Sequence, residues 1–136
     1  MKAGKEHRVP LSPQAIELLR AALAWRESAL PSALVFPGSR RGRPLSDMSI
    51  TAVLRRMVDG EGRPRWVDDR GAAIVPHGFR SAFRDWAAEC RGEMREVAEA
   101  SLAHTIGNAT ERAYLRSDVF DRRRALMDAW GEFLEA

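Results

Sequence analysis

Apolar residues recur at helical spacing in the last part of the chain, and this pattern limits the possible folds more than any other feature. Over residues 119–134 the apolar stripe consists of Phe120, Leu126, Met127, Trp130, Phe133 and Leu134. Side chains three and four positions apart lie on one face of a helix, so this face needs a partner surface. That partner is either the core of the same chain or another protomer.

Three earlier segments begin with residues that favour the start of a helix. Ser12 can cap a helix that has Pro13 at its first position and runs to about Arg26. Ser46 can cap a second helix of about a dozen residues. A third helix is predicted after Pro76. The apolar faces of the second and third helices are formed by Ile50, Val53, Leu54 and Met57, and by Phe79, Phe83, Trp86 and Ala87.

The remaining segments predict one more helix, a strand and loops. Residues 94–103 are expected to be helical. KEHRVPLS, residues 5–12, predicts a short strand that ends at Pro10. Residues 59–75 are rich in glycine, proline and charge, which predicts a loop or a loose hairpin about residues 69–71. The expected fold is therefore one mainly α domain with a small β-hairpin or sheet, of the α+β class.

Composition excludes several classes of protein. The chain has 136 residues, 45% of them hydrophobic and 30% charged, which is enough for one domain with a core. No apolar run approaches the roughly 18 residues that cross a bilayer, and the start lacks the apolar core of a signal peptide. An intracellular protein without a membrane segment is expected. The single cysteine, Cys90, permits no internal disulfide and no cysteine-based metal site.

The basic residues are almost all arginine. The formal net charge is +3, and lysine occurs only at Lys2 and Lys5. Arginine makes bidentate contacts with phosphate, but a GC-rich genome also favours arginine codons, so composition does not decide between these explanations. The turn-rich segment with Arg40, Arg41 and Arg43 is likewise either a solvated loop or a contact for a phosphate backbone.

Four residues indicate a site for an anionic phosphate. His77 and Arg80 lie three positions apart at a predicted helix start, where they can share a face beside free N–H groups. Residues 101–118, SLAHTIGNATERAYLRSD, contain His104 and then Tyr114, the only tyrosine of the chain. Each residue alone also has an ordinary structural explanation, such as a wet helix face or a core tyrosine. Their order and spacing together favour the site.

These stretches resemble the tyrosine recombinases, and most closely the integrases of prophages and genomic islands. The resemblance covers nearly the whole chain. It is carried by MKAGKEHRVPLS, LVFPGSRRGRPLSD, PHGFRSAFRDWAAE, REVAEASLAHTIGNATERAYLRSD and RRRALMDAWGEFLEA. The implied fold is the catalytic domain of these DNA breaking and rejoining enzymes.

The resemblance also implies a role for each site residue. Lys2 corresponds to the family's lysine on a β-hairpin, with Lys5 as the neighbouring alternative. His77 and Arg80 correspond to the His-x-x-Arg pair, His104 to the second histidine, and Tyr114 to the nucleophile. No metal and no other cofactor is implied.

The implied reaction is site-specific recombination or integration of DNA. Tyr114 would form a covalent 3′-phosphotyrosine bond and release a 5′-hydroxyl strand. The implied partners are double-stranded attachment sites, contacted through Arg40, Arg41, Arg43 and Arg84, and further copies of the protein in a tetramer on DNA. The expected location is the cytoplasm of a bacterial cell, with the gene carried by a prophage or a similar element.

Two departures from the family pattern bear on these expectations. Ala103 stands where many members carry glycine before the histidine. The family's first catalytic arginine and its N-terminal DNA-binding domain belong upstream of the lysine hairpin. The chain is therefore expected to be an N-terminally truncated, C-terminal part of a recombinase that is incompetent alone. The alternative is a non-catalytic remnant that binds DNA or associates with itself.

Overall fold

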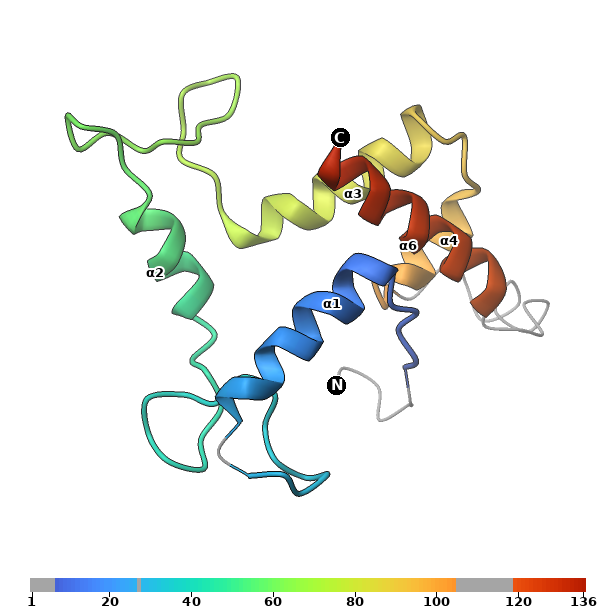
Figure 1. Ribbon diagram of the computed structural model, residues 1–136. Helices are drawn as coiled ribbons and strands as arrows, with labels where there is room; N and C mark the ends of the chain where they lie inside the picture. Colours follow the sequence, from blue (N-terminus) through green and yellow to red (C-terminus); the bar gives the residue numbers. More distant parts are fainter. Residues whose placement is uncertain (1–6, 27, 105–118) are drawn as a thin grey trace. The chain divides into compact units, whose positions relative to one another are not determined.

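The computed structural model describes residues 7–26, 28–104 and 119–136, and over these ranges the chain is mainly helical (Figure 1). The elements are α1 (Pro13–Ala22), the short 3₁₀ helix η1 (Leu23–Trp25), α2 (Ser49–Arg56), α3 (Pro76–Glu89), α4 (Arg95–Ser101) and α6 (Phe120–Glu135). The chain divides into two compact units, Leu19–Ser81 and Met1–Leu18 with Ala82–Ala136. No helix in the described part is long and apolar enough to cross a membrane.

The helix starts at Ser12 and Pro76 are confirmed. The Ser12 hydroxyl accepts a hydrogen bond from the Ala15 N–H at 3.3 Å, as an N-cap does, and α3 begins at Pro76. The helix predicted from Ser46 is shorter than expected. The Ser46 hydroxyl instead accepts from the Met48 N–H at 3.2 Å, which stabilises a turn before α2 begins at Ser49.

The strand predicted to end at Pro10 is wrong for its described part, residues 7–10, which is irregular. The carbonyl of Arg8 accepts a hydrogen bond from Nη2 of Arg123 at 2.5 Å instead of from a neighbouring strand. Arg123 lies in α6 and is only 2% exposed. The buried guanidinium of Arg123 therefore anchors this segment, and no pairing with a neighbouring strand is seen among its described residues. The expected small sheet is not confirmed.

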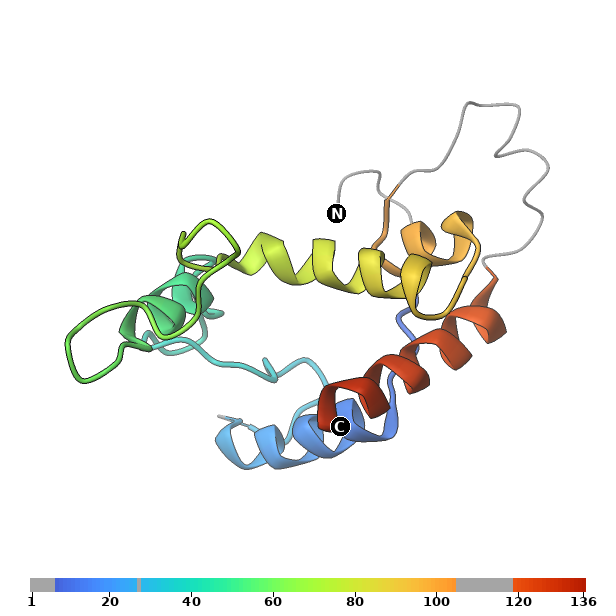
Figure 2. The same cartoon turned by 90° about the horizontal axis from the view of Figure 1, so that it is seen from above.

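The β-pairing among the described residues consists of three isolated bridges, Pro37–Pro44, Val58–Pro64 and Val67–Ala73. The segment predicted to be a loop or a loose hairpin about residues 69–71 contains a tight turn, in which the Asp68 N–H donates to the Ala72 carbonyl at 2.8 Å. A second turn precedes it, so that two separate loops follow α2 (Figure 2). In that turn backbone and side-chain hydrogen bonds from Arg63 hold the pKa of Asp59 below its usual range.

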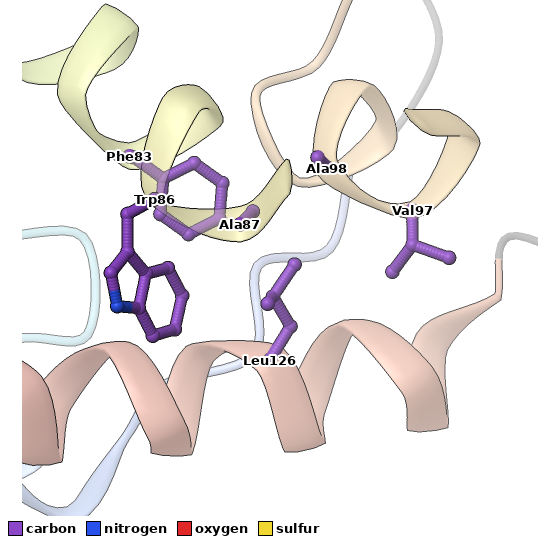
Figure 3. Packing of buried hydrophobic residues seen from close by; sticks show 6 residues of the cluster. All are labelled: Phe83, Trp86, Ala87, Val97, Ala98 and Leu126. Carbon is purple, nitrogen blue, oxygen red and sulfur yellow. The ribbon is translucent and has the colours of Figure 1, made fainter. Parts of the chain in front are cut away.

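One apolar core lies where the end of α3 meets α4 and α6. The side chains of Phe83, Trp86, Ala87, Val97, Ala98 and Leu126 point toward one another and are at most 7% exposed (Figure 3). Trp130 of α6 packs beside them, edge-on to Phe83 with ring centroids 5.5 Å apart. The predicted apolar stripe of the last helix thus contributes to the core of its own chain.

The apolar faces of the helices are only partly buried. Phe79 belongs to the predicted apolar face of α3, but the residue is 53% exposed. Phe133 and Leu134 at the end of α6 are also more than half exposed, and none of the eight described residues of α2 is buried. Helical periodicity predicted which residues share a face but not how far along each helix the packing extends.

Substitutions of two leucines of α6 are expected to differ strongly in their effect on the free energy of unfolding. Leu126→Ala is expected to lower the free energy of unfolding by about 2–4 kcal/mol, because it empties a site that is 3% exposed. Leu134→Ala, at a site 64% exposed, should change it by about 0.5 kcal/mol or less. Urea denaturation of both variants checks this, and equal losses would contradict the assigned core.

Candidate catalytic site

The end of α4 presents His104 in a defined backbone geometry. The His104 N–H donates to the Glu99 carbonyl at 3.0 Å, and the Ala103 N–H donates to the Ala100 carbonyl at 3.2 Å. Ala103 has a φ of 56°, in the left-handed region. This combination of bonds is a Schellman motif, which ends a helix and fixes the residue that follows the left-handed position. His104 is that residue.

Glu99 links two of the predicted site residues. Its Oε2 lies 2.6 Å from Nδ1 of His104, and its Oε1 lies 3.5 Å from Nε of Arg84 on α3. The Glu99 side chain is 9% exposed, whereas those of His104 and Arg84 are 44% and 59% exposed. A nearly buried carboxylate is thus shared by two cationic or potentially cationic groups that reach the surface.

Sequence reasoning missed Glu99. One signal was available, because Glu99 directly follows the apolar pair Val97 and Ala98 within the helix predicted over residues 94–103. An acidic residue at such a position needs a partner. The partner could not be identified from helical spacing, since His104 lies beyond the end of the helix.

His77 and Arg80 lie in the first two turns of α3. They are three positions apart, so the helix brings them to one face as predicted. His77 is exposed and Arg80 is partly buried. These two residues belong to the unit Leu19–Ser81, and Arg84 and His104 belong to the other unit.

The arginine-rich loop is a tight turn with exposed side chains. The Gly38 N–H donates to the Arg43 carbonyl at 2.7 Å, and the Arg43 N–H donates to the Arg40 carbonyl at 3.0 Å. Gly38 has no space for a side chain, because an added Cβ would lie 2.5 Å from the Pro44 carbonyl oxygen. A shallow hollow beside the turn is lined by Gly38, Ser39, Arg40, Arg43, Pro44, Leu45, Ser46 and Ser49. Arg40 and Arg43 thus border one surface feature, and Arg41 is exposed on the same turn.

Two predicted catalytic residues, Lys2 and Tyr114, lie outside the described residues, as does the alternative Lys5. Their roles stay predictions. Across the part of the chain that the structure does describe, no three histidine, cysteine, aspartate or glutamate residues gather as a metal site would require.

The chain is similar in sequence to a known family and to several of its known members. The model of the phage integrase family matches residues 1–119. The prophage integrase IntA of Escherichia coli strain K12 is 31% identical over 139 residues, which cover 100% of this chain and 30% of the relative. The integrase of Enterobacteria phage P4 is 29% identical over 137 residues, covering 99% of this chain and 28% of the relative.

A similar relation holds for the tyrosine recombinase XerC of Actinobacillus pleuropneumoniae serotype 7. It is 30% identical over 128 residues, which cover 94% of this chain and 39% of the relative. The chain therefore spans less than half the length of each of these three relatives. No solved structure matches it.

The left-handed conformation of Ala103 predicts a stabilising substitution. Ala103→Gly is expected to raise the free energy of unfolding by about 0.5–1 kcal/mol, because glycine adopts a positive φ without a Cβ clash. Ala100→Gly, inside α4, is the matched control and should lower it by about 0.5–1 kcal/mol. Thermal unfolding of both variants measures whether each substitution raises or lowers the stability. A loss of stability in Ala103→Gly would contradict the assigned helix end.

Proposed function

Because this chain belongs to the phage integrase family, we propose that it is part of a tyrosine recombinase that cuts and rejoins DNA at specific sites. The observation that carries the proposal is the family match over residues 1–119, a range that contains His77, Arg80, His104 and Tyr114. Since the chain spans only part of its relatives, the activity, the DNA substrate and the assembly on DNA are all parts of this proposal.

Tyr114 is the proposed nucleophile. A tyrosine hydroxyl has an ordinary pKa near 10, so its attack on DNA needs positioning and a group that accepts its proton. Its oxygen attacks the phosphorus and forms a 3′-phosphotyrosine bond, while the bond from phosphorus to the 5′-oxygen breaks. Lys2 gives a proton to the departing 5′-oxygen, and His77 assists proton transfer or orients the phosphate. Attack by a second 5′-hydroxyl reverses these steps and rejoins the strand.

Arg80 and His104 are the proposed donors to the non-bridging phosphate oxygens. Negative charge gathers on these oxygens in the transition state, where fixed hydrogen-bond donors are most effective. Two features of the described residues support the assignment. Arg80 shares a helix face with His77, and the Schellman motif fixes the backbone of His104. Loss of one such donor costs about 100- to 1,000-fold in rate.

Double-stranded DNA is the proposed partner, held by phosphate contacts from Arg40, Arg41, Arg43 and Arg84. The first three are exposed on one turn, as a phosphate contact requires. Arg84 reaches the surface while its Nε faces Glu99. Strand exchange between two duplexes would involve four copies of the complete protein, in the cytoplasm of a bacterial cell.

A covalent adduct with DNA tests the proposal. The protein, including any upstream residues that its gene encodes, is incubated with a nicked duplex that carries its attachment site. The proposal predicts an adduct that survives denaturing electrophoresis and that is lost in Tyr114→Phe, because the variant lacks the attacking oxygen. Arg80→Ala should lower the cleavage rate by about 100- to 1,000-fold.

Two results would contradict this assignment. An adduct that forms equally well with Tyr114→Phe would show that another residue is the nucleophile. Specific DNA binding with no adduct in any form of the protein would support the alternative, a remnant that binds DNA without catalysis.

The arginine-rich turn gives a separate prediction about DNA binding. Arg40→Ala with Arg43→Ala should weaken binding to a duplex and reduce the slope of log affinity against log salt by about 1 for each DNA phosphate that is no longer neutralised. Arg20→Ala, an exposed arginine on α1, is the matched control and should leave the slope unchanged. Fluorescence anisotropy over a salt series measures both. An unchanged slope in the double variant would show that the turn is only solvated.

A further inference from the structure

Glu99 carries a charge where the packing by itself favours an apolar residue. The whole residue is 7% exposed and follows Val97 and Ala98, which are 0% and 4% exposed in the core. Moving an ionised carboxylate out of water is costly unless it is paired, and well-packed apolar residues often replace buried ion pairs without loss of stability. The presence of a glutamate here is therefore better explained by what it does to its partners than by packing.

The contact between Glu99 and His104 indicates which ring nitrogen of the histidine carries a proton. An ionised carboxylate only accepts hydrogen bonds, so the 2.6 Å contact with Oε2 of Glu99 requires a proton on Nδ1 of His104. With Nδ1 committed to Glu99, His104 would contact a phosphate oxygen through Nε2. Buried hydrogen-bond partners fix the tautomer and orientation of metal-binding and catalytic histidines in the same way.

Two further contacts restrict the movement of this pair. The backbone of Glu99 accepts the His104 N–H at 3.0 Å, so both the main chain and the side chain of His104 are tied to one residue. Nε of Arg84 lies 3.5 Å from the second carboxylate oxygen and balances its charge. The carboxylate can therefore face a DNA-binding surface without presenting an unbalanced negative charge to phosphate.

We infer that Glu99 is a positioning residue for His104, which holds the ring as the Nδ1–H tautomer and directs Nε2 toward the DNA phosphate. Arg84 supports this arrangement by fixing the other carboxylate oxygen. The inference rests on the proposed function for the role of His104, but the tautomer itself does not depend on catalysis.

The first test is nuclear magnetic resonance of the chain with ¹⁵N-labelled histidine, at a pH where the ring is neutral. His104→Gln identifies the signals of His104. The inference predicts the Nδ1–H tautomer in the unmodified chain and a shift toward the Nε2–H tautomer in Glu99→Met, which keeps the side-chain length without an oxygen. Glu99→Gln keeps an acceptor and should retain part of the Nδ1–H form. Glu96→Met, on the same helix, is the matched control and should change nothing.

The second test measures DNA cleavage by the same variants of the complete protein. Glu99→Met should cut the rate by about 10- to 100-fold, as expected for the partner that orients a functional histidine. In a His104→Ala background it should have little further effect, because both substitutions act through one group. Circular dichroism and thermal unfolding establish that each variant is folded, and Glu99→Gln provides a second variant if Glu99→Met does not fold.

The outcomes separate the inference from the proposed function. An Nε2–H tautomer in the unmodified chain overturns the inference whatever the protein does to DNA. So does full cleavage by folded Glu99→Met, or an equal loss of rate with and without His104. If the tautomer is as inferred but His104→Ala cleaves normally, the assigned role of His104 fails, and the Glu99–His104 bond remains as a feature of the structure.

Discussion

One face of α6 is buried against α4 and the end of α3. The compact unit that contains residues 82–136 depends on this packing. Leu126 and Trp130 occupy that face, and Phe83, Trp86 and Val97 complete the surface that they cover. Because α4 is only seven residues long, its conformation depends on this packing more than on its own helical propensity. The positions of Glu99 and His104 at the end of α4 therefore depend on the packing of this helix against the aromatic and aliphatic side chains of α3 and α6.

The candidate site uses the end of that packed helix. Glu99 belongs both to the buried side of α4 and, through its carboxylate, to the surface where His104 and Arg84 lie. A left-handed residue at Ala103 turns the chain back so that the histidine meets a carboxylate five positions before it. Rigid packing below and a fixed helix end above are what a phosphate-binding histidine needs if it is to act without rearrangement.

Features that depend on a few neighbouring residues were predictable from the sequence. Contacts made only in the folded chain were not. Ser12 and Pro76 start helices for reasons contained within a few residues, and both starts are confirmed. The strand predicted to end at Pro10 was wrong because its described part is held by Arg123, which lies far away in the sequence. Glu99 was missed for a different reason: His104 is only five positions away, but it lies beyond the end of α4, where helical spacing no longer predicts which side chains meet. Tyr114 lies outside the described residues, so its place in the site stays a prediction from the sequence.

We propose that His77, Arg80 and His104 act on the phosphate attacked by Tyr114. A crystal or cryo-electron microscopy structure of the complete protein trapped on a nicked attachment-site duplex tests it most directly. The predicted result is one phosphate linked to Tyr114, with Arg80 and Nε2 of His104 within hydrogen-bonding distance of its oxygens and Nδ1 of His104 still on Glu99. A phosphate held by other residues, or one that faces Nδ1, would contradict the account.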